Sequence, residues 1–211
     1  MQHDIFKLCA DSLRILSHEN YETKLKAAHA HELVAAFLGY KSKNAMLADT
    51  KHPLSNLDQA EIVVMIPDEF IDERRDNLQG WPSEQPDNYM LGEAFYERLF
   101  SQDIWVSPYP PFRSFDKAAK YLVENNDAFQ AVFKTLHNIP MHHVVTVQKS
   151  EEEVVLNVLH AYEPPAEKTL VGGKTTIKLP RVAGHIGFGK PKISVEQWTA
   201  GARRTLKSLG V

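Results

Sequence analysis

Only one cysteine, Cys9, occurs among the 211 residues of this chain. A single cysteine excludes a disulfide within the chain and fits a reducing compartment. No apolar run approaches the length of about 18 residues that a membrane span needs. The first residues, MQHDIFKLCADSLRIL, have no basic flank followed by an apolar block, so we expect no secretion signal and no membrane contact. These absences together predict a cytoplasmic protein.

Catalytic and cofactor motifs are also missing. No Gly-x-Ser-x-Gly, His-Glu-x-x-His or zinc-finger spacing occurs in the sequence. GGKTT at 172–176 has Lys168 where a phosphate-binding loop needs its first glycine, and a predicted strand rather than a helix follows it. GHIGFGK at 184–190 lacks the strand–turn–helix context of a dinucleotide site. We interpret both as turns or bulges, assign no catalytic residue and expect no cofactor.

Charge is distributed unevenly along the chain, although the net charge is only -3. Residues 56–140 carry seven Lys and Arg against fifteen Asp and Glu, whereas residues 166–211 carry nine against two. A basic end of this kind suits an anionic partner such as nucleic acid. Alternatively, it balances the acidic middle within the same molecule or across a dimer. The charge pattern leaves both interpretations open, and it leaves the oligomeric state open.

The clearest local pattern lies between Lys24 and Asp49. Apolar residues recur at helical spacing up to Gly39, which is suited to end a helix because glycine tolerates a left-handed conformation. Ser42 then has the hydroxyl expected of an N-cap for a second, short helix over 43–48. The sequence therefore predicts two helices joined by a tight turn, with Gly39 essential to the turn.

This segment, HAHELVAAFLGYKSKNAMLAD, resembles a small helical module at the N-terminus of glyoxalase-related proteins. It is also similar to segments of bacterial proteins carried on plasmids and integrative elements. The residues that carry the likeness are His31, Glu32, Leu33, Ala35, Gly39, Tyr40, Ser42, Ala45 and Leu47. The resemblance implies a bacterial, mobile-element origin and transfers no chemistry.

Patterns along the remaining chain predict an α+β fold. A breaker cluster at 53–56 divides a helical module, 1–55, from an α+β domain, 56–211. Within that domain we expect a mostly helical middle over 56–140, because apolar residues there recur mainly at helical spacing. Alternating residues predict a small antiparallel sheet over 141–193, including a hairpin with strands near 142–149 and 153–162. Ser194 is then positioned to cap a basic C-terminal helix over 194–210.

Basic side chains supply the candidate nucleic-acid contacts. The helix pair around Gly39 has the size of a helix-turn-helix, but its second helix is short and offers few polar residues to base edges. Plain packing is therefore the alternative for that module. Phosphate contacts would come from Lys41, Lys43, Asn44, Lys174, Lys178, Arg181, Lys190, Lys192, Arg203, Arg204 and Lys207.

Ten histidines raise the alternative of a metal site. A site built from His142 or His143 with His160 and Glu163 is compatible with paired strands, but it needs further ligands from elsewhere. Glyoxalase-type enzymes use His and Glu on strands, which gives this alternative its specific form. We expect no stoichiometric metal. The leading hypothesis is a non-enzymatic binding or regulatory protein that contacts nucleic acid or a protein partner, and the alternatives are a metal-dependent glyoxalase-like enzyme and a structural oligomer subunit.

Overall fold

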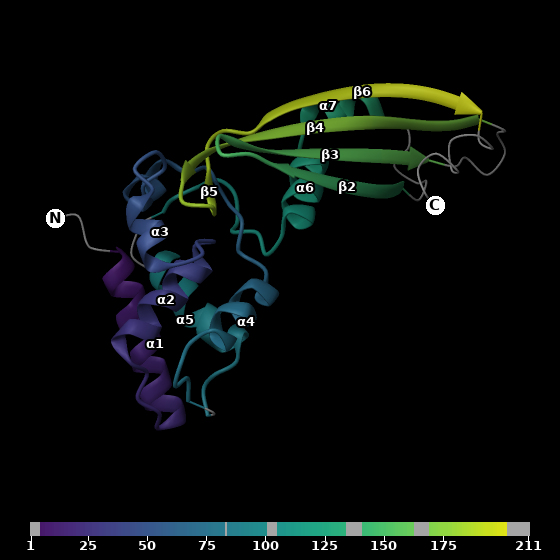
Figure 1. Ribbon diagram of the computed structural model, residues 1–211. Coiled ribbons are helices and arrows are strands. Elements are labelled where there is room, and N and C mark those ends of the chain that lie inside the picture. The colour runs from purple at the N-terminus through teal and green to yellow at the C-terminus, as the bar shows by residue number, and fades with distance from the viewer. Residues whose placement is uncertain (1–4, 83, 101–104, 134–140, 163–168, 202–211) are drawn as a thin grey trace. The chain divides into compact units, whose positions relative to one another are not determined.

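The chain forms two compact units, which we call the helical unit, residues 1–114 with 181–190, and the sheet unit, residues 115–180 with 191–211. The computed structural model (Figure 1) describes residues 5–82, 84–100, 105–133, 141–162 and 169–201. Helices dominate the first unit and antiparallel strands the second, so the predicted α+β class is confirmed. Across the described ranges, every helix is too short or too polar to span a bilayer.

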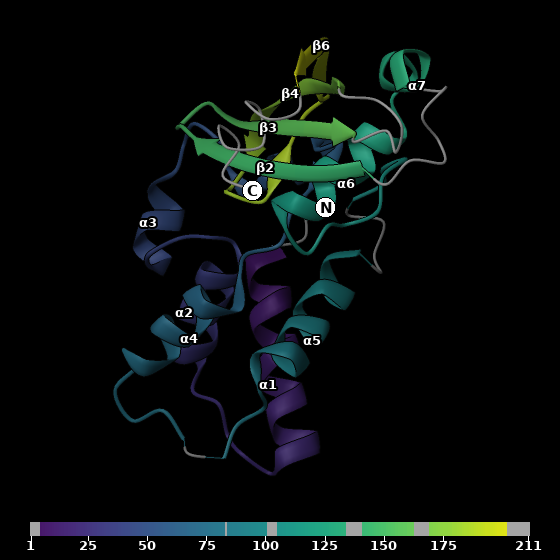
Figure 2. The same ribbon diagram turned by 90° about the vertical axis from the view of Figure 1, so that its right-hand side faces the viewer.

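The helical unit is built around a core of buried apolar side chains. Its helices are α1 (Ile5–Tyr21), α2 (Ala27–Phe37), α3 (Lys43–Ala48), η1 (Leu54–Gln59), α4 (Asp68–Asp76) and α5 (Asn88–Phe100). Helix α1 packs against α2 and α5, and α2 also packs against α4 (Figure 2). Leu13, Leu33 and Phe95 are fully buried between them. Cys9 lies in the same core, where burial raises the pKa of its thiol to about 12 despite the nearby Arg98 charge, so it acts as a small hydrophobe.

The turn between α2 and α3 matches its prediction. Gly39 has a φ of +84°, and the Ser42 hydroxyl accepts a hydrogen bond from the Ala45 backbone N–H. A Cβ on Gly39 would lie 2.6 Å from the Cβ of His185, closer than real Cβ atoms approach one another. Glycine is therefore required here by backbone conformation and by packing.

The division of the chain differs from the predicted boundary after residue 55. Pro53 precedes η1 as its N-cap, and Leu57 of η1 is fully buried in the core shared with α1 and α2. Residues 56–114 therefore fold with the N-terminal module rather than with the sheet. The unit also contains a short ribbon made of β1 (Ile62–Val63), β5 (Gly187–Phe188) and the end of β4 from Arg181 to Ala183.

Four long antiparallel strands form the sheet unit. They are β2 (Met141–Lys149), β3 (Glu153–Tyr162), β4 (Thr169–Ala183, which leaves the unit after Pro180) and β6 (Lys192–Gly201). Their order is β6–β4–β3–β2, and the β2–β3 hairpin is the predicted one. Two helices complete the unit, α6 (Phe115–Glu124) and α7 (Asp127–Phe133).

The predicted C-terminal helix is wrong over residues 194–201. These residues belong to β6, which pairs with β4 along its whole length from Lys192 to Gly201. Ile193 and Val195 alternate with polar residues and are β-branched, so the segment suits a strand once a partner is present. Pairing with the long β4 outweighs a weak helical pattern, and residues 202–210 of the predicted helix lie outside the described part of the chain.

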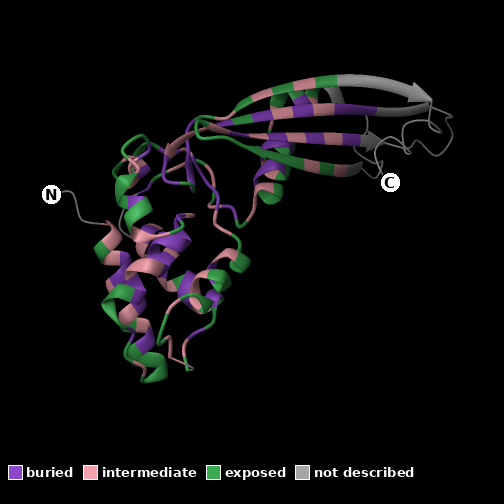
Figure 3. Ribbon diagram, viewed as in Figure 1, coloured by how far each residue is buried: buried purple, intermediate pink, exposed green. Residues whose placement is uncertain are grey.

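Helices α6 and α7 cover one face of the sheet. The Phe129 ring of α7 lies tilted against the His160 ring, with centroids 4.8 Å apart, and Lys149 Nζ lies over the Phe115 ring of α6. Lys149 pairs with Val154, which shares a face of β3 with His160, so both helices lie on the same face. Burial along β3 alternates accordingly between buried and half-buried residues (Figure 3).

Candidate nucleic-acid interface

The face of the sheet opposite α6 and α7 presents the candidate interface. Along β4, Thr175, Ile177 and Leu179 are buried toward the helices, whereas Lys174 and Lys178 point to the other face. Within the described part of the sheet unit, no helix or strand covers that second face. We call it the open face.

Strand register brings three of the predicted lysines together on the open face. Lys178 of β4 pairs directly with Lys192 of β6, and Lys174 pairs with Glu196. Lys178 and Lys192 are exposed, and neither has an ion pair with any residue that the structure describes. Like charges directly opposite one another on paired strands are destabilising. The arrangement therefore places two positive charges side by side, with no ion pair to either among the described residues.

Strand register places Trp198 of β6 on the open face, opposite Gly172. The other residues of this face whose side chains the structure describes are not aromatic. Those residues are Val144, Thr146, Gln148, Glu153, Val155, Asn157, Leu159, Lys174, Thr176, Lys178, Lys192, Ser194 and Glu196. Sheet surfaces that read single-stranded bases do so by stacking them on aromatic rings. The face offers lysines, hydroxyls and amides, which suit contact with phosphates. It also carries the carboxylates of Glu153 and Glu196.

Arg181 does not belong to this face, although it lies on the same strand. In the helical unit its Nη2 lies 2.6 Å from Asp49 Oδ2, and the two side chains are 9% and 14% exposed. The Tyr40 hydroxyl donates to the same carboxylate at 2.6 Å, and the His52 backbone N–H donates to its second oxygen at 3.0 Å. The phosphate contact predicted for Arg181 is therefore disfavoured, because a buried internal ion pair already matches its charge.

The pKa values in this cluster follow from that geometry. Burial alone would raise the pKa of Asp49, but the bonds from Tyr40 and the His52 backbone, together with Arg181, lower it overall. Burial, and then the Asp49 carboxylate, raise the pKa of Tyr40. The cluster thus holds one ionised carboxylate against one guanidinium and a neutral phenol, which is a structural clamp between the α3 end and the β4–β5 ribbon.

Other predicted basic residues are dispersed. Lys41, Asn44 and Lys190 are exposed in the helical unit. Lys43 is half-buried, with Nζ 5.8 Å from the Phe6 ring centroid and 3.4 Å from His31 Nδ1. Helix α3 has only six residues, so it offers little more than one turn to a DNA groove. The remaining candidates, Arg203, Arg204 and Lys207, lie outside the described residues.

Beneath the sheet, the histidines proposed as a metal site form a hydrogen-bonded chain instead. His143 Nδ1 lies 2.9 Å from His160 Nδ1, and His160 Nε2 lies 2.8 Å from Thr175 Oγ1. Burial, and secondarily the charge of His143, lower the pKa of His160 to about 4, so its ring is neutral near pH 7. Thr175 is fully buried and cannot meet a substrate.

The metal alternative lacks the ligands it needs among the described residues. They contain no group of three or more His, Cys, Asp or Glu placed to hold an ion. Of the proposed ligands, only His143 and His160 are seen to come together. The side chain of His142 and the whole of Glu163 lie outside the part of the chain that the structure describes. Two imidazoles in mutual hydrogen-bond contact make a structural link between β2 and β3.

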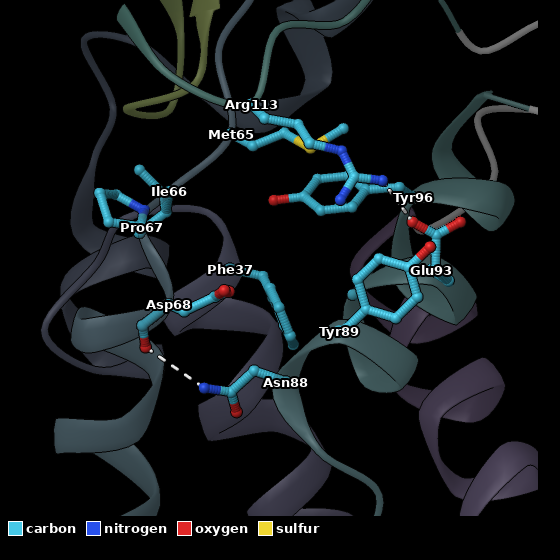
Figure 4. A pocket seen from close by; sticks show the side chains of 11 residues that line it. Phe37, Met65, Ile66, Pro67, Asp68, Asn88, Tyr89, Glu93, Tyr96 and Arg113 are labelled. Carbon is cyan, nitrogen blue, oxygen red and sulfur yellow. Dashed lines mark hydrogen bonds and ion pairs between the residues drawn. The ribbon is translucent and has the colours of Figure 1, made fainter.

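A cavity of about 100 Å³ in the helical unit was not predicted from the sequence. Its walls include Phe37, Met65 and Ile66, and its rim carries Asp68, Glu93 and Arg113 (Figure 4). Tyr89, Glu93 and Tyr96 contribute from one side of α5, at the i, i+4 and i+7 spacing of a single helix face. This spacing could have indicated from the sequence that the three side chains share one face of a helix. It could not have indicated which other elements would lie opposite that face.

Buried Asn88 fixes the junction of α4 and α5 at the edge of this cavity. Its Nδ2 donates to the Asp68 carbonyl at 3.3 Å and to the Asp72 carboxylate at 2.6 Å, and its Oδ1 accepts from Arg75 at 2.7 Å. The cavity wall is therefore held by a hydrogen-bond network that uses both ends of one amide.

Comparison with known proteins adds no relative to this geometry. Scans against family models, curated proteins and solved structures found no match for the chain. The resemblance of residues 24–49 to the glyoxalase-associated and mobile-element modules stays a prediction, and the site must be interpreted from its own residues.

Proposed function

We propose that this protein is a non-enzymatic nucleic-acid-binding protein that contacts the phosphate backbone through the open face of the sheet unit. The observation that carries the proposal is the direct pairing of Lys178 with Lys192 on that face. A phosphate placed between two such ammonium groups relieves their repulsion and releases the counterions that it had condensed. Binding of this kind depends strongly on salt.

The chemistry of the face also limits what it recognises. With Trp198 as the one aromatic residue that strand register places on the described open face, most contacts go to phosphates and sugars, which carry no sequence information. We therefore expect weak binding to single-stranded DNA and RNA with little sequence preference. A bacterial, mobile-element origin and a cytoplasmic location belong to the same proposal, supported by the resemblance at 24–49 and by the cysteine content.

A binding titration with mixed-sequence single strands at two salt concentrations tests the proposal. Lys178→Gln combined with Lys192→Gln should weaken binding and reduce the slope of log affinity against log salt by about 1.4, because each lost phosphate contact contributes about 0.7. Lys120→Gln on α6 is the matched control, since it removes the same charge from the covered side and should leave the slope unchanged.

Three results would contradict the proposal. They are no binding at about 50 mM salt, where non-specific contacts are strong, an unchanged slope in the double variant, and an equal loss in the Lys120→Gln control. If the unmodified protein binds neither DNA nor RNA, a protein partner becomes the better hypothesis for the open face. A stoichiometric metal in the purified protein would instead revive the enzyme alternative.

A further inference from the structure

The cavity between α2, α4 and α5 has the form of a small-ligand site rather than a packing defect. Aromatic rings of Phe37, Tyr89 and Tyr96 contribute to its lining, and Met65 and Ile66 add flexible apolar surface (Figure 4). Gly92 leaves room in the wall, because an added Cβ there would lie 3.6 Å from Phe37 Cε1 and 3.7 Å from Tyr96 Cε2. Ligand pockets typically combine apolar and aromatic walls with a few placed polar groups.

One polar group within this lining lacks a partner. The Tyr96 hydroxyl is buried and makes no hydrogen bond with the described residues. Burial raises the pKa of Tyr96, and a weaker interaction with the Ile66 backbone lowers it. An interaction that lowers a phenol pKa is made to its oxygen, so the hydroxyl hydrogen is still without an acceptor. A buried hydroxyl left unpaired is costly, so it points to a missing acceptor. The phenol stays protonated and is available as a donor.

Charged groups at the rim are already matched. Arg113 Nη2 lies 2.9 Å from Glu93 Oε1, and its guanidinium stacks over the Tyr89 ring at 5.3 Å. The remaining carboxylate at the rim, Asp68, is exposed to water. No charge inside the cavity calls for a counter-ion, so the chemistry favours a neutral ligand.

We propose that this cavity binds a monocyclic aromatic molecule carrying one hydrogen-bonding oxygen or nitrogen, which accepts a hydrogen bond from the Tyr96 hydroxyl. A cavity of about 150 Å³ lined by apolar residues is large enough to hold benzene. The present cavity, at about 100 Å³, is smaller and is bordered by exposed charged residues, so a single ring is the largest ligand that we expect it to hold, with its outer edge at that border. This site is in the helical unit and is independent of the proposed nucleic-acid contact.

Phenol and toluene are the probes, because they have nearly the same shape and differ in the polar group. The methyl resonances of Met65 and Ile66 report occupancy directly as each probe is titrated by NMR. We expect saturable shifts with both probes. Tyr96→Phe should lower the ratio of phenol affinity to toluene affinity about three- to tenfold, the effect of losing one neutral hydrogen bond. Gly92→Leu, which fills the cavity, should abolish the shifts for both.

Tyr121→Phe in α6 is the matched control, since it removes the same hydroxyl from the other unit and should leave the affinity ratio unchanged. Absence of saturable Met65 and Ile66 shifts at about 10 mM phenol, ten times a millimolar dissociation constant, would overturn the site. An unchanged ratio in Tyr96→Phe would overturn the assigned donor. Because Tyr96→Phe removes a single oxygen, this second result stays decisive even if Gly92→Leu does not fold.

Discussion

Strand β4 carries two basic residues only three positions apart that serve opposite purposes. Arg181 belongs to the helical unit, where Asp49, Tyr40 and the Gly184 carbonyl surround its guanidinium. Lys178 belongs to the sheet unit, where it is exposed, faces Lys192 and has no ion pair with the described residues. Charge type and position along the chain do not distinguish these two residues. Their surroundings do, because a desolvated charge must be paired and a hydrated one need not be.

The two units also differ in how they bury polar groups. In the helical unit, the Asp49 carboxylate accepts hydrogen bonds from Tyr40, His52 and Arg181, and the Asn88 amide links α5 to three residues of α4. In the sheet unit, the buried polar chain runs through neutral His160 to Thr175 under Phe129. The helical unit buries the charged Asp49 carboxylate beside the charged Arg181, whereas the sheet unit buries His160 in its neutral form. This contrast predicts different responses to substitution and to pH.

The largest effect is expected where the helical unit has no room for change. Gly39→Val should destabilise the unit by about 2–5 kcal/mol, combining about 1–2 for a left-handed L-residue with about 1–3 for overpacking against His185. Gly80 also has a positive φ, but a Cβ there meets only Lys26 Nζ, at 3.4 Å. Gly80→Val should therefore lower the free energy of unfolding only by about 1–2 kcal/mol, the cost of a left-handed L-residue. Urea unfolding followed through the amide signals of the helical unit measures both, and equal losses would remove the packing argument.

Next in size is the loss of the buried ion pair. Arg181→Gln should cost about 3 kcal/mol, because it leaves the Asp49 carboxylate buried without its counter-charge. Lys178→Gln should change stability by no more than about 0.5 kcal/mol, as for an ordinary surface position. Denaturant midpoints of the two variants compare them directly. Similar midpoints would mean that the buried Arg181 charge contributes no more to stability than the exposed Lys178 charge.

Acid should destabilise the sheet unit through His160. Its pKa in the folded protein, about 4, lies below the ordinary 6.5, so the unfolded chain binds a proton first as the pH falls. The stability that the neutral His160 ring contributes is complete above pH 6.5, and it is lost progressively as the pH falls from 6.5 to 4. Between about pH 7 and pH 5 this amounts to about 2 kcal/mol, at about 1.4 kcal/mol per pH unit of difference.

Replacing His160 by Met should flatten this pH dependence in urea unfolding of the sheet unit. His18→Gln removes an exposed histidine from α1 and serves as the control, because it should leave the slope intact. A slope that persists unchanged in His160→Met would show that other groups control the acid response.

The smallest expected effect concerns the lysine pair. Lys192→Glu replaces a repulsive cross-strand pair with an attractive one, so it should stabilise the sheet unit by about 0.2–1 kcal/mol while weakening polyanion binding. Lys190→Glu, at an exposed position outside the β4–β6 pairing, is the matched control for stability. Destabilisation by Lys192→Glu would mean that Lys178 and Lys192 do not repel each other in the folded protein.

Local patterns were sufficient for several elements. The α2–α3 turn was predictable because a glycine at φ +84° and a serine cap are properties of single positions. The β2–β3 hairpin was predictable because alternation of apolar residues specifies both a strand and its buried face.

By itself, the sequence determined the α+β class, the helix pair, the hairpin and the surplus of positive charge in the last quarter of the chain. Only the tertiary structure decided that residues 192–201 form a strand, that Arg181 pairs with a carboxylate 132 positions away, and that Lys178 faces Lys192. It alone assembled the Tyr96 cavity, from α2, α4, α5 and the non-helical residues Met65, Ile66, Pro67 and Arg113. The physical reason is that desolvation and cross-strand pairing depend on partners distant in the chain, which local periodicity does not encode.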